Sequence, residues 1–245
     1  LGDIHVDLAI ERIARKFDVN LDTALPNIAY RETVGGQTSA SYKHKKQSGG
    51  HGQYGHVVLE IAPGETGKGI TFGSKVVGGN VPKDYIPAVE KGVRNAANSG
   101  VVAGFPVVDV AVMLTDGSSH SVDSSGMAFE IAASMGFRQA VREARPTLLE
   151  PVMNLRILTP DDCAGDVMSD LSTRRAQIGG MESKGNGVTE IIAVAPASTM
   201  QRYAADLRSL THARGDFTAI MDHYEPLPAQ EASKVIASRQ SSEDE

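Results

Sequence analysis

The chain has 245 residues, of which 41% are hydrophobic and 22% charged, and its formal net charge is −6. This composition is typical of a globular protein with room for one large or two modest domains. The chain contains no run of about 18 uninterrupted apolar residues that could span a membrane, and Cys163, the single cysteine, cannot form an internal disulfide. We expect no secretory signal, because the first residues lack the charged and then apolar pattern of one.

These exclusions predict a cytoplasmic protein without a membrane partner, and we expect a monomer. The chain begins Leu1-Gly2-Asp3, without an initiator methionine, so we expect a piece of a longer protein.

The first 33 residues predict a strand, a helix and a strand. The helix follows Asp7 and carries Leu8, Ile13 and Phe17 at helical spacing. A short strand is expected at residues 28–30. One helix with two short strands cannot bury an apolar face alone, so we expect half of a small domain.

Residues 34–150 predict a second domain that mixes strands and helices. Strands are expected at 37–46, 54–61 and 107–115, with loops at 63–69 and 78–80. Two helices are expected from apolar residues at helical spacing, which are Ile86, Val89 and Val93 in the first and Met127, Ile131, Met135 and Val141 in the second.

Residues 151–228 predict the order strand, helix, strand, strand, helix, strand. The strands are expected near 152–158, 177–184, 188–195 and 216–224, and this order is typical of a ferredoxin-like fold. The fold class is therefore α+β. The tail, 229–245, ends in acidic residues that we expect to be frayed, and residues 231–239 predict a short helix.

Residues 40–58 are the most informative part of the chain. The cations Lys43, Lys45 and Lys46 come before a glycine-rich turn, and a β-branched run follows it. Glycine allows backbone angles that a side chain forbids and a close approach to a partner. A basic projection on an acidic chain favours binding to phosphate, and nucleic acid is the partner that we expect.

Other chemistry fits the sequence less well. Residues 64–69 have too few residues between their glycines for a nucleotide-binding phosphate loop, and no Ser or Thr follows Lys68. Four histidines, His44, His51, His56 and His120, could make the chain a metal-dependent hydrolase, but they lack metal-ligand spacing. A serine nucleophile with His120 and Asp123 would place a whole triad in one loop. We therefore predict no catalytic or metal-binding residue.

The last domain carries a second set of donors. Arg208 and Arg214 lie with Ser209, Thr211 and His212 around the expected end of a helix. Such a cluster suits contacts to phosphate groups, which position a protein without reading sequence.

Many segments match one family in the same order along the chain. They include Gly2-Asp3-Ile4-His5-Val6, Ala29-Tyr30-Arg31-Glu32-Thr33, Lys46-Gln47-Ser48-Gly49-Gly50, Gly52-Gln53-Tyr54-Gly55-His56-Val57, Gly104-Phe105-Pro106-Val107-Val108-Asp109, Leu149-Glu150-Pro151-Val152-Met153 and Asp206-Leu207-Arg208-Ser209. The chain resembles the C-terminal part of bacterial elongation factor G, the ribosomal translocase.

The resemblance implies a layout. Residues 1–33 would be the second half of domain III, and residues 34–150 would be domain IV, which is similar to ribosomal protein S5 with a βαβ crossover. Residues 151–228 would be the ferredoxin-like domain V, followed by the C-terminal helix and acidic tail at 229–245. The domain that hydrolyses GTP with Mg²⁺ would be missing, so we expect no cofactor and no enzymatic activity in this chain.

The resemblance also implies the site and the partners. Two tip loops of domain IV would contact the tRNA–mRNA duplex in the A site of the ribosome, next to the 16S rRNA. The first comprises Ser48, Gly49, Gly50, His51, Gly52, Gln53 and Tyr54, and the second comprises Ser118, Ser119, His120 and Ser121. Arg208 and Arg214 would face the 23S rRNA.

Some residues depart from the family pattern. His51 stands where arginine is common, and Gly126 stands where glutamate is common. These changes resemble those of elongation factor G-like paralogues. The implied function is translocation of tRNA and mRNA during elongation, and the alternative is a paralogue that acts in ribosome recycling or protection.

Overall fold

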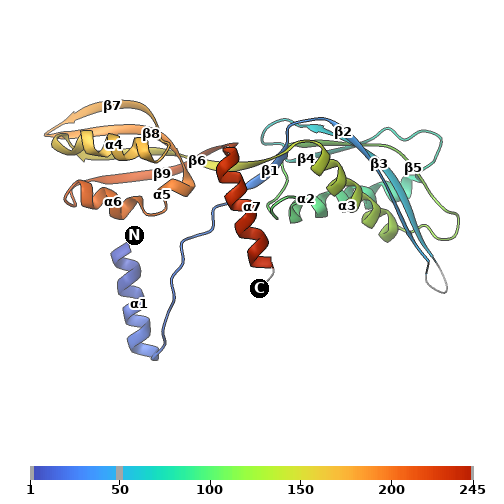
Figure 1. Ribbon diagram of the computed structural model, residues 1–245, viewed down its shortest axis with the longest axis horizontal. Coiled ribbons are helices and arrows are strands. Elements are labelled where there is room, and N and C mark those ends of the chain that lie inside the picture. Colours follow the sequence, from blue (N-terminus) through green and yellow to red (C-terminus); the bar gives the residue numbers. More distant parts are fainter. Residues whose placement is uncertain (1–2, 48–51, 244–245) are drawn as a thin grey trace. The chain divides into compact units, whose positions relative to one another are not determined.

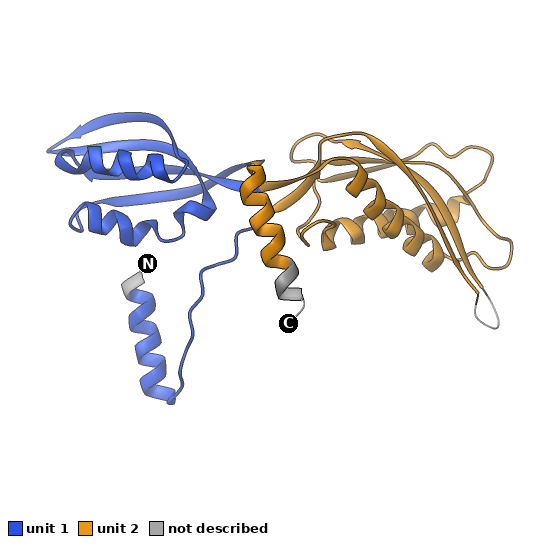
Figure 2. Cartoon of the chain, viewed as in Figure 1, with its two compact units in different colours: residues 1–29, 150–225 blue, residues 30–149, 226–245 orange. Residues whose placement is uncertain are grey.

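The computed structural model describes residues 3–47 and 52–243. The chain forms two compact units (Figures 1 and 2). Unit 1 contains Leu1–Ala29 and Glu150–Glu225, and unit 2 contains Tyr30–Leu149 and Pro226–Glu245. The predicted domain boundaries at 34, 151 and 229 stay predictions.

Unit 2 is built on a four-stranded sheet with the order β2-β3-β5-β4. The strands are β2 (Thr38–Lys46), β3 (Gln53–Pro63), β4 (Ile70–Ser74) and β5 (Val110–Ser118). β3 is antiparallel to β2 and β5, whereas β4 is parallel to β5. Three of these strands match the predicted ones. The sequence analysis missed β4, which has only five residues and contains Gly73.

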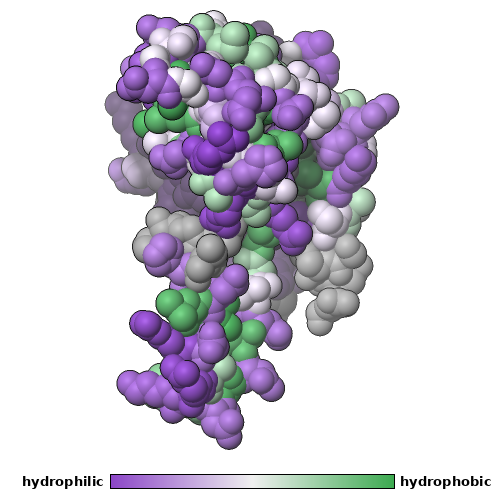
Figure 3. Space-filling view, turned by 90° about the vertical axis from the view of Figure 1, so that its left-hand side faces the viewer, coloured by the Kyte–Doolittle hydropathy of each residue, from purple (hydrophilic) through white to green (hydrophobic). Residues whose placement is uncertain are grey.

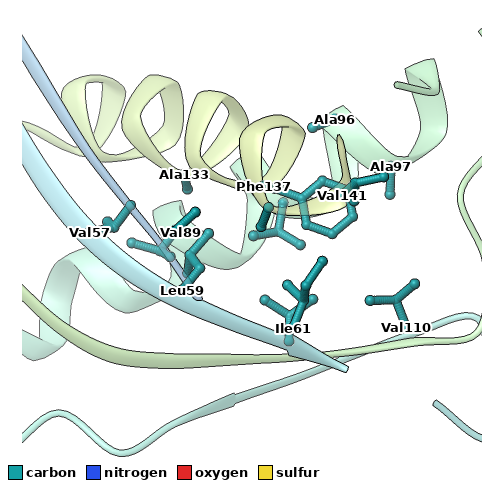
Figure 4. Close-up of a cluster of buried hydrophobic side chains, with 14 of the residues drawn as sticks. Val57, Leu59, Ile61, Val89, Ala96, Ala97, Val110, Ala133, Phe137 and Val141 are labelled. Atoms are coloured by element: carbon teal, nitrogen blue, oxygen red, sulfur yellow. The ribbon is translucent and has the colours of Figure 1, made fainter. Parts of the chain in front are cut away.

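Helices α2 (Ile86–Ser99) and α3 (Gly126–Glu143) cover one face of this sheet (Figure 1). Between helices and sheet lies a fully buried core that includes Leu59, Val89 and Phe137 (Figure 4). Alternate residues of β3 point into this core, so the residues between them, such as His56 and Glu60, lie on the open face of the sheet.

The second predicted helix is α3, but of the four apolar residues that indicated it only Val141 is fully buried. Met127 and Met135 are 66% and 42% exposed. The buried face instead consists mainly of small residues, with Ala128, Phe129, Ala132, Ala133, Gly136, Phe137, Ala140 and Val141. Small residues allow close packing: a Cβ at Gly92 of α2 would lie 2.2 Å from the Glu130 carbonyl oxygen of α3. Met127 and Met135 lie on the solvent-exposed face of α3.

The N-terminal segment also differs from the prediction. Helix α1 (Asp3–Phe17) begins before Asp7, so the expected first strand is wrong, and β1 (Arg31–Val34) begins after the strand expected at 28–30. Val6, Leu8, Ile13 and Phe17 are between 41% and 61% exposed, so α1 leaves apolar surface uncovered (Figure 3).

Glu32 of β1 anchors unit 2 from the inside. Its side chain is fully buried, and its two carboxylate oxygens accept hydrogen bonds from the backbone N–H groups of Val101, Val102, Ala103 and Phe105 at 2.8–3.1 Å. A buried carboxylate must be compensated by donors. Four amides satisfy Glu32, and they fix the turn that follows α2.

Helix α7 (Ala229–Glu243) completes unit 2. It starts before and ends after the helix predicted at 231–239. Ala232, Val235 and Ile236 pack against a small buried cluster that contains Phe105 and Leu148. A pocket of about 280 Å³ lies beside this contact, and Glu32, Leu148 and Ile236 are among its lining residues.

Unit 1 has the predicted ferredoxin-like order. After the start of β6 (Pro146–Pro160) come α4 (Ala164–Thr173), β7 (Gln177–Gly185), β8 (Val188–Pro196), α5 (Ala197–Met200), α6 (Tyr203–Leu210) and β9 (Asp216–Pro226). The strand order is β9-β6-β8-β7, and the core includes Leu155, Ile191 and Tyr203. The first residues of β6 lie in unit 2, where they pair with β1. Among the helices that the structure describes, none is long and apolar enough to cross a membrane.

Candidate nucleic-acid interface

Two loops that the sequence singles out meet at one end of the unit 2 sheet. The hairpin loop joins β2 to β3, and the β5–α3 loop contains residues 119–125. The backbone N–H of Gly52 donates to Asp123 Oδ1 at 3.0 Å, and the N–H of Tyr54 donates to the Asp123 carbonyl oxygen at 2.8 Å. We call this end of unit 2 the tip. Ser48, Gly49, Gly50 and His51 lie outside the described residues.

Serines and a glycine explain why the β5–α3 loop folds against β3. Ser125 is the N-cap of α3, where its side chain accepts a hydrogen bond from the Ala128 N–H. Ser124 Oγ accepts from the His120 N–H at 2.8 Å and donates to the Tyr54 carbonyl oxygen at 3.0 Å. A Cβ at Gly52 would lie 3.0 Å from the carboxyl carbon of Asp123, so only glycine fits there without displacement.

The imidazole of His120 is held by its own loop. Nδ1 lies 3.3 and 3.2 Å from the backbone N–H donors of Val122 and Asp123, and 3.3 Å from Asp123 Oδ2. A neutral ring that accepts at Nδ1 carries its proton on Nε2, and a charged ring carries a proton there too. With Nδ1 accepting from these two N–H groups, His120 presents an Nε2–H donor, and the side chain is 52% exposed.

A second network fixes Tyr54 from the open face of the sheet. Ser118 Oγ lies 2.8 Å from Tyr54 Oη and 2.9 Å from His56 Nδ1, while His56 Nε2 lies 2.9 Å from Ser41 Oγ. Burial, and secondarily the charge of Lys43, lowers the pKa of His56 below its usual value. The Tyr54 and His120 rings are 6.1 Å apart at their centroids.

The sequence analysis placed Ser118 and Tyr54 in the site but missed Ser41 and His56 as their supports. It named Asp123 only as a member of the triad that it rejected, whereas Asp123 bonds to Gly52 and Tyr54. The polar residues at alternate positions of β2, and Tyr54 and His56 two apart on β3, were the available signal.

A hollow of about 170 Å³ lies at the tip. It is lined by residues of both loops and of the adjoining strands, namely Lys45, Lys46, Gln47, Gly52, Gln53, Tyr54, His120 and Asp123. Ser119 and Ser121 flank His120 and are exposed. Donors outnumber the single carboxylate in this lining, so the hollow suits an anionic group.

Two of the candidate histidines and the glycine-rich loop at 64–69 are engaged by other groups of the chain. His44 Nε2 lies 2.9 Å from Gln53 Oε1, and His56 is engaged by serines. Within residues 3–47 and 52–243, no group of three or more side chains is arranged to hold a metal ion. In the loop at 64–69, the N–H groups of Gly67 and Gly69 donate to Asp109 Oδ1, so they hold a carboxylate of the chain itself.

The predicted arginines belong to unit 1. Arg208 on α6 is half-buried, and no ion pair to it is found in the described part of the chain. Arg214 Nη2 lies 3.1 Å from Asp162 Oδ2, and this hydrogen bond lowers the pKa of the Asp162 carboxyl. Thr211 is buried and donates to the Leu207 carbonyl oxygen at 2.7 Å. Thr211 is therefore structural, and the donor cluster is smaller than predicted.

Comparison with known proteins adds to this geometry. Residues 26–145 match the family "Elongation factor G, domain IV", and residues 147–235 match "Elongation factor G C-terminus". Proteins called elongation factor G from Jannaschia sp. (strain CCS1) and Dinoroseobacter shibae are 46% and 47% identical over 97% and 96% of this chain. The chain covers 33% of each, so it spans about a third of their length.

A solved structure is similar as well. A crystal structure of a protein from Thermus thermophilus matches with a TM-score of 0.87 and 38% identity. The match covers 98% of this chain and 36% of that protein. The chain belongs to the elongation factor G family and corresponds to its C-terminal part.

Proposed function

We propose that this chain is the ribosome-binding part of a translational GTPase that promotes translocation of tRNA and mRNA. The observation that carries the proposal is the tip, where two loops are locked together and present the Nε2–H donor of His120. Membership of the elongation factor G family supports it. GTP and Mg²⁺ would bind in a domain of the longer protein, and the whole would work in the cytoplasm.

The tip would act as a wedge against the tRNA–mRNA duplex in the A site. The groove that A-form RNA offers to protein is wide and shallow, and it displays 2′-hydroxyls and phosphates. The side chain of His120 can meet such groups without reading bases. The contribution would be steric and electrostatic, because a wedge only has to block backward movement and forms no bond.

The tip can block movement only if it is held firmly by the rest of unit 2. Gly52, the residue before β3, is hydrogen-bonded to Asp123 of the β5–α3 loop, and this loop runs directly into the capped first turn of α3. A force on the tip would therefore be transmitted to both the sheet and α3. In unit 1, Arg208 and Arg214 would contact the 23S rRNA, with Arg214 leaving Asp162 to do so.

The test is His120→Ala in the full-length protein. Loss of one hydrogen bond to RNA should slow single-round translocation roughly tenfold, while ribosome-stimulated GTP hydrolysis stays unchanged. His120→Gln is the matched control, because its amide nitrogen can replace Nε2 whereas His120→Asn can only replace Nδ1. Unchanged tRNA movement in His120→Ala would remove the assigned role.

The alternative is a paralogue that splits ribosomes or protects them. His51 in place of the arginine common in the family favours it, because an imidazole is mostly neutral at pH 7. A splitting assay beside the translocation assay, with the same full-length protein, separates the two.

A further inference from the structure

The open face of the unit 2 sheet carries positive charge along its edge. β2 is an edge strand, and its residues alternate between the helix-covered face and the open face. Tyr42 packs on the core, so Lys43 and Lys45 lie on the open face, where they pair across strands with His56 and Tyr54.

These two ammonium groups are not neutralised by the described part of the chain. Lys91, Lys184 and Lys234 each form an ion pair with a glutamate. No such pair is found for Lys43 or Lys45, and both residues are exposed. Free positive charge on a chain with a net charge of −6 calls for an anionic partner.

The surface beside the lysines is polar and uncharged. Ser41, His56, Ser118 and Tyr54 are joined by hydrogen bonds across three strands. Lys43 is close enough to His56 to favour its neutral form. Asp116, whose charge acts on His56, accepts a hydrogen bond from Asn80.

We propose that Lys43 and Lys45 form a second RNA contact, which continues from the tip along β2 and binds the phosphodiester backbone of an RNA strand. Residues two apart on a strand are about 6.7 Å apart, so each ammonium meets a different phosphate. The contact reads no bases. This inference rests on the proposed ribosome binding, but not on the role of His120.

A different role for the same lysines must be separated from this one. Lysines on an exposed edge strand discourage pairing with another chain, and a glutamate at the same position does so equally well. Binding to phosphate requires a positive charge. The sign of the charge therefore distinguishes the two roles.

The experiment measures ribosome affinity of the full-length protein, with a non-hydrolysable GTP analogue, between 50 and 200 mM salt. Lys43→Glu/Lys45→Glu and Lys43→Gln/Lys45→Gln are compared with the unmodified protein. Each phosphate contact contributes about 0.7 to 0.9 to the slope of log affinity against log salt. Loss of two contacts should make the slope shallower by about 1.5. The ratio of the unmodified protein's affinity to that of the glutamine variant should therefore fall about eightfold between 50 and 200 mM salt.

The control is Lys68→Glu, an exposed lysine in the loop that follows the far end of β3. It should leave affinity and slope unchanged. Unmodified affinity and slope in Lys43→Glu/Lys45→Glu would overturn the inference, and aggregation of the glutamine variant alone would assign the lysines to edge protection. His120→Ala is measured alongside: if it slows translocation while the lysine variants bind normally, only the second contact is wrong.

Discussion

Substitution of Glu32 measures how much one buried carboxylate contributes to the stability of unit 2. Replacement by alanine would leave four backbone donors without an acceptor, three of them buried, and each loss of a buried partner costs about 1–3 kcal/mol. We expect Glu32→Ala to lower the free energy of unfolding by about 4 kcal/mol or more, measured by urea denaturation. The control is Glu60→Ala, an exposed glutamate on the open face, for which we expect a change within about 0.5 kcal/mol. Equal effects would contradict the anchoring role.

His56 gives a pH-dependent test of the open face. Its folded-state pKa is lowered, first by burial and then by Lys43. The neutral form is thus favoured on folding, so this contribution to stability is present above about pH 6.5 and is lost as the pH falls through the folded pKa. An NMR titration should find the His56 midpoint below 6.5, and Lys43→Gln should raise it. An unchanged midpoint in that variant would place Lys43 away from His56.

Residues of the site differ in how far the sequence could reveal them. His120 and the glycines stood out because turn residues and an imidazole in one loop have few structural explanations. Asp123 did not, because an aspartate before a helix is expected to be a cap. Its bond to Gly52 joins residues 71 positions apart, and such a partner cannot be found from local spacing.

At the scale of elements, the α2–α3 contact depends on a glycine. Ala is the better helix former by about 1 kcal/mol, but the Cβ of Gly92→Ala would lie 2.2 Å from the Glu130 carbonyl oxygen. We expect Gly92→Ala to lower the thermal midpoint because the helices must separate. Gly126→Ala, whose Cβ would lie 3.7 Å from the Ala88 side chain, should be neutral or stabilising. Thermal unfolding by circular dichroism measures both, and a stable Gly92→Ala would contradict the close packing.

The same contact explains why the residues that indicated the helix are mostly not the residues that α3 buries. Periodicity weights large apolar residues, so Met127 and Met135 defined the expected stripe of α3. The helix instead turns Ala132, Ala133 and Gly136 inward, because close approach to β3 and α2 needs small side chains. The ferredoxin-like unit lacked this ambiguity, since its strands and helices carry large apolar residues at the expected spacing.

At the scale of the whole molecule, the local charge of one strand is opposite in sign to the net charge of the chain. The chain is acidic overall, yet three lysines gather on the last four residues of β2. An acidic body limits nonspecific adhesion to RNA, whereas a small basic region directs contact to one end of unit 2. Composition alone does not indicate a nucleic-acid partner, whereas the local pattern of lysines and glycines does.

The packing of α7 has a consequence for biosynthesis. Phe105 and Leu148 are made early, but the helix that covers them includes Ile236. A growing polypeptide therefore leaves the exit tunnel with this apolar surface bare while all of β7, β8 and β9 is still being synthesised. Unit 2 can begin to fold around its own sheet, but α7 covers the cluster only when synthesis is almost complete. A nascent chain stalled before residue 232 should therefore be the form most dependent on chaperones.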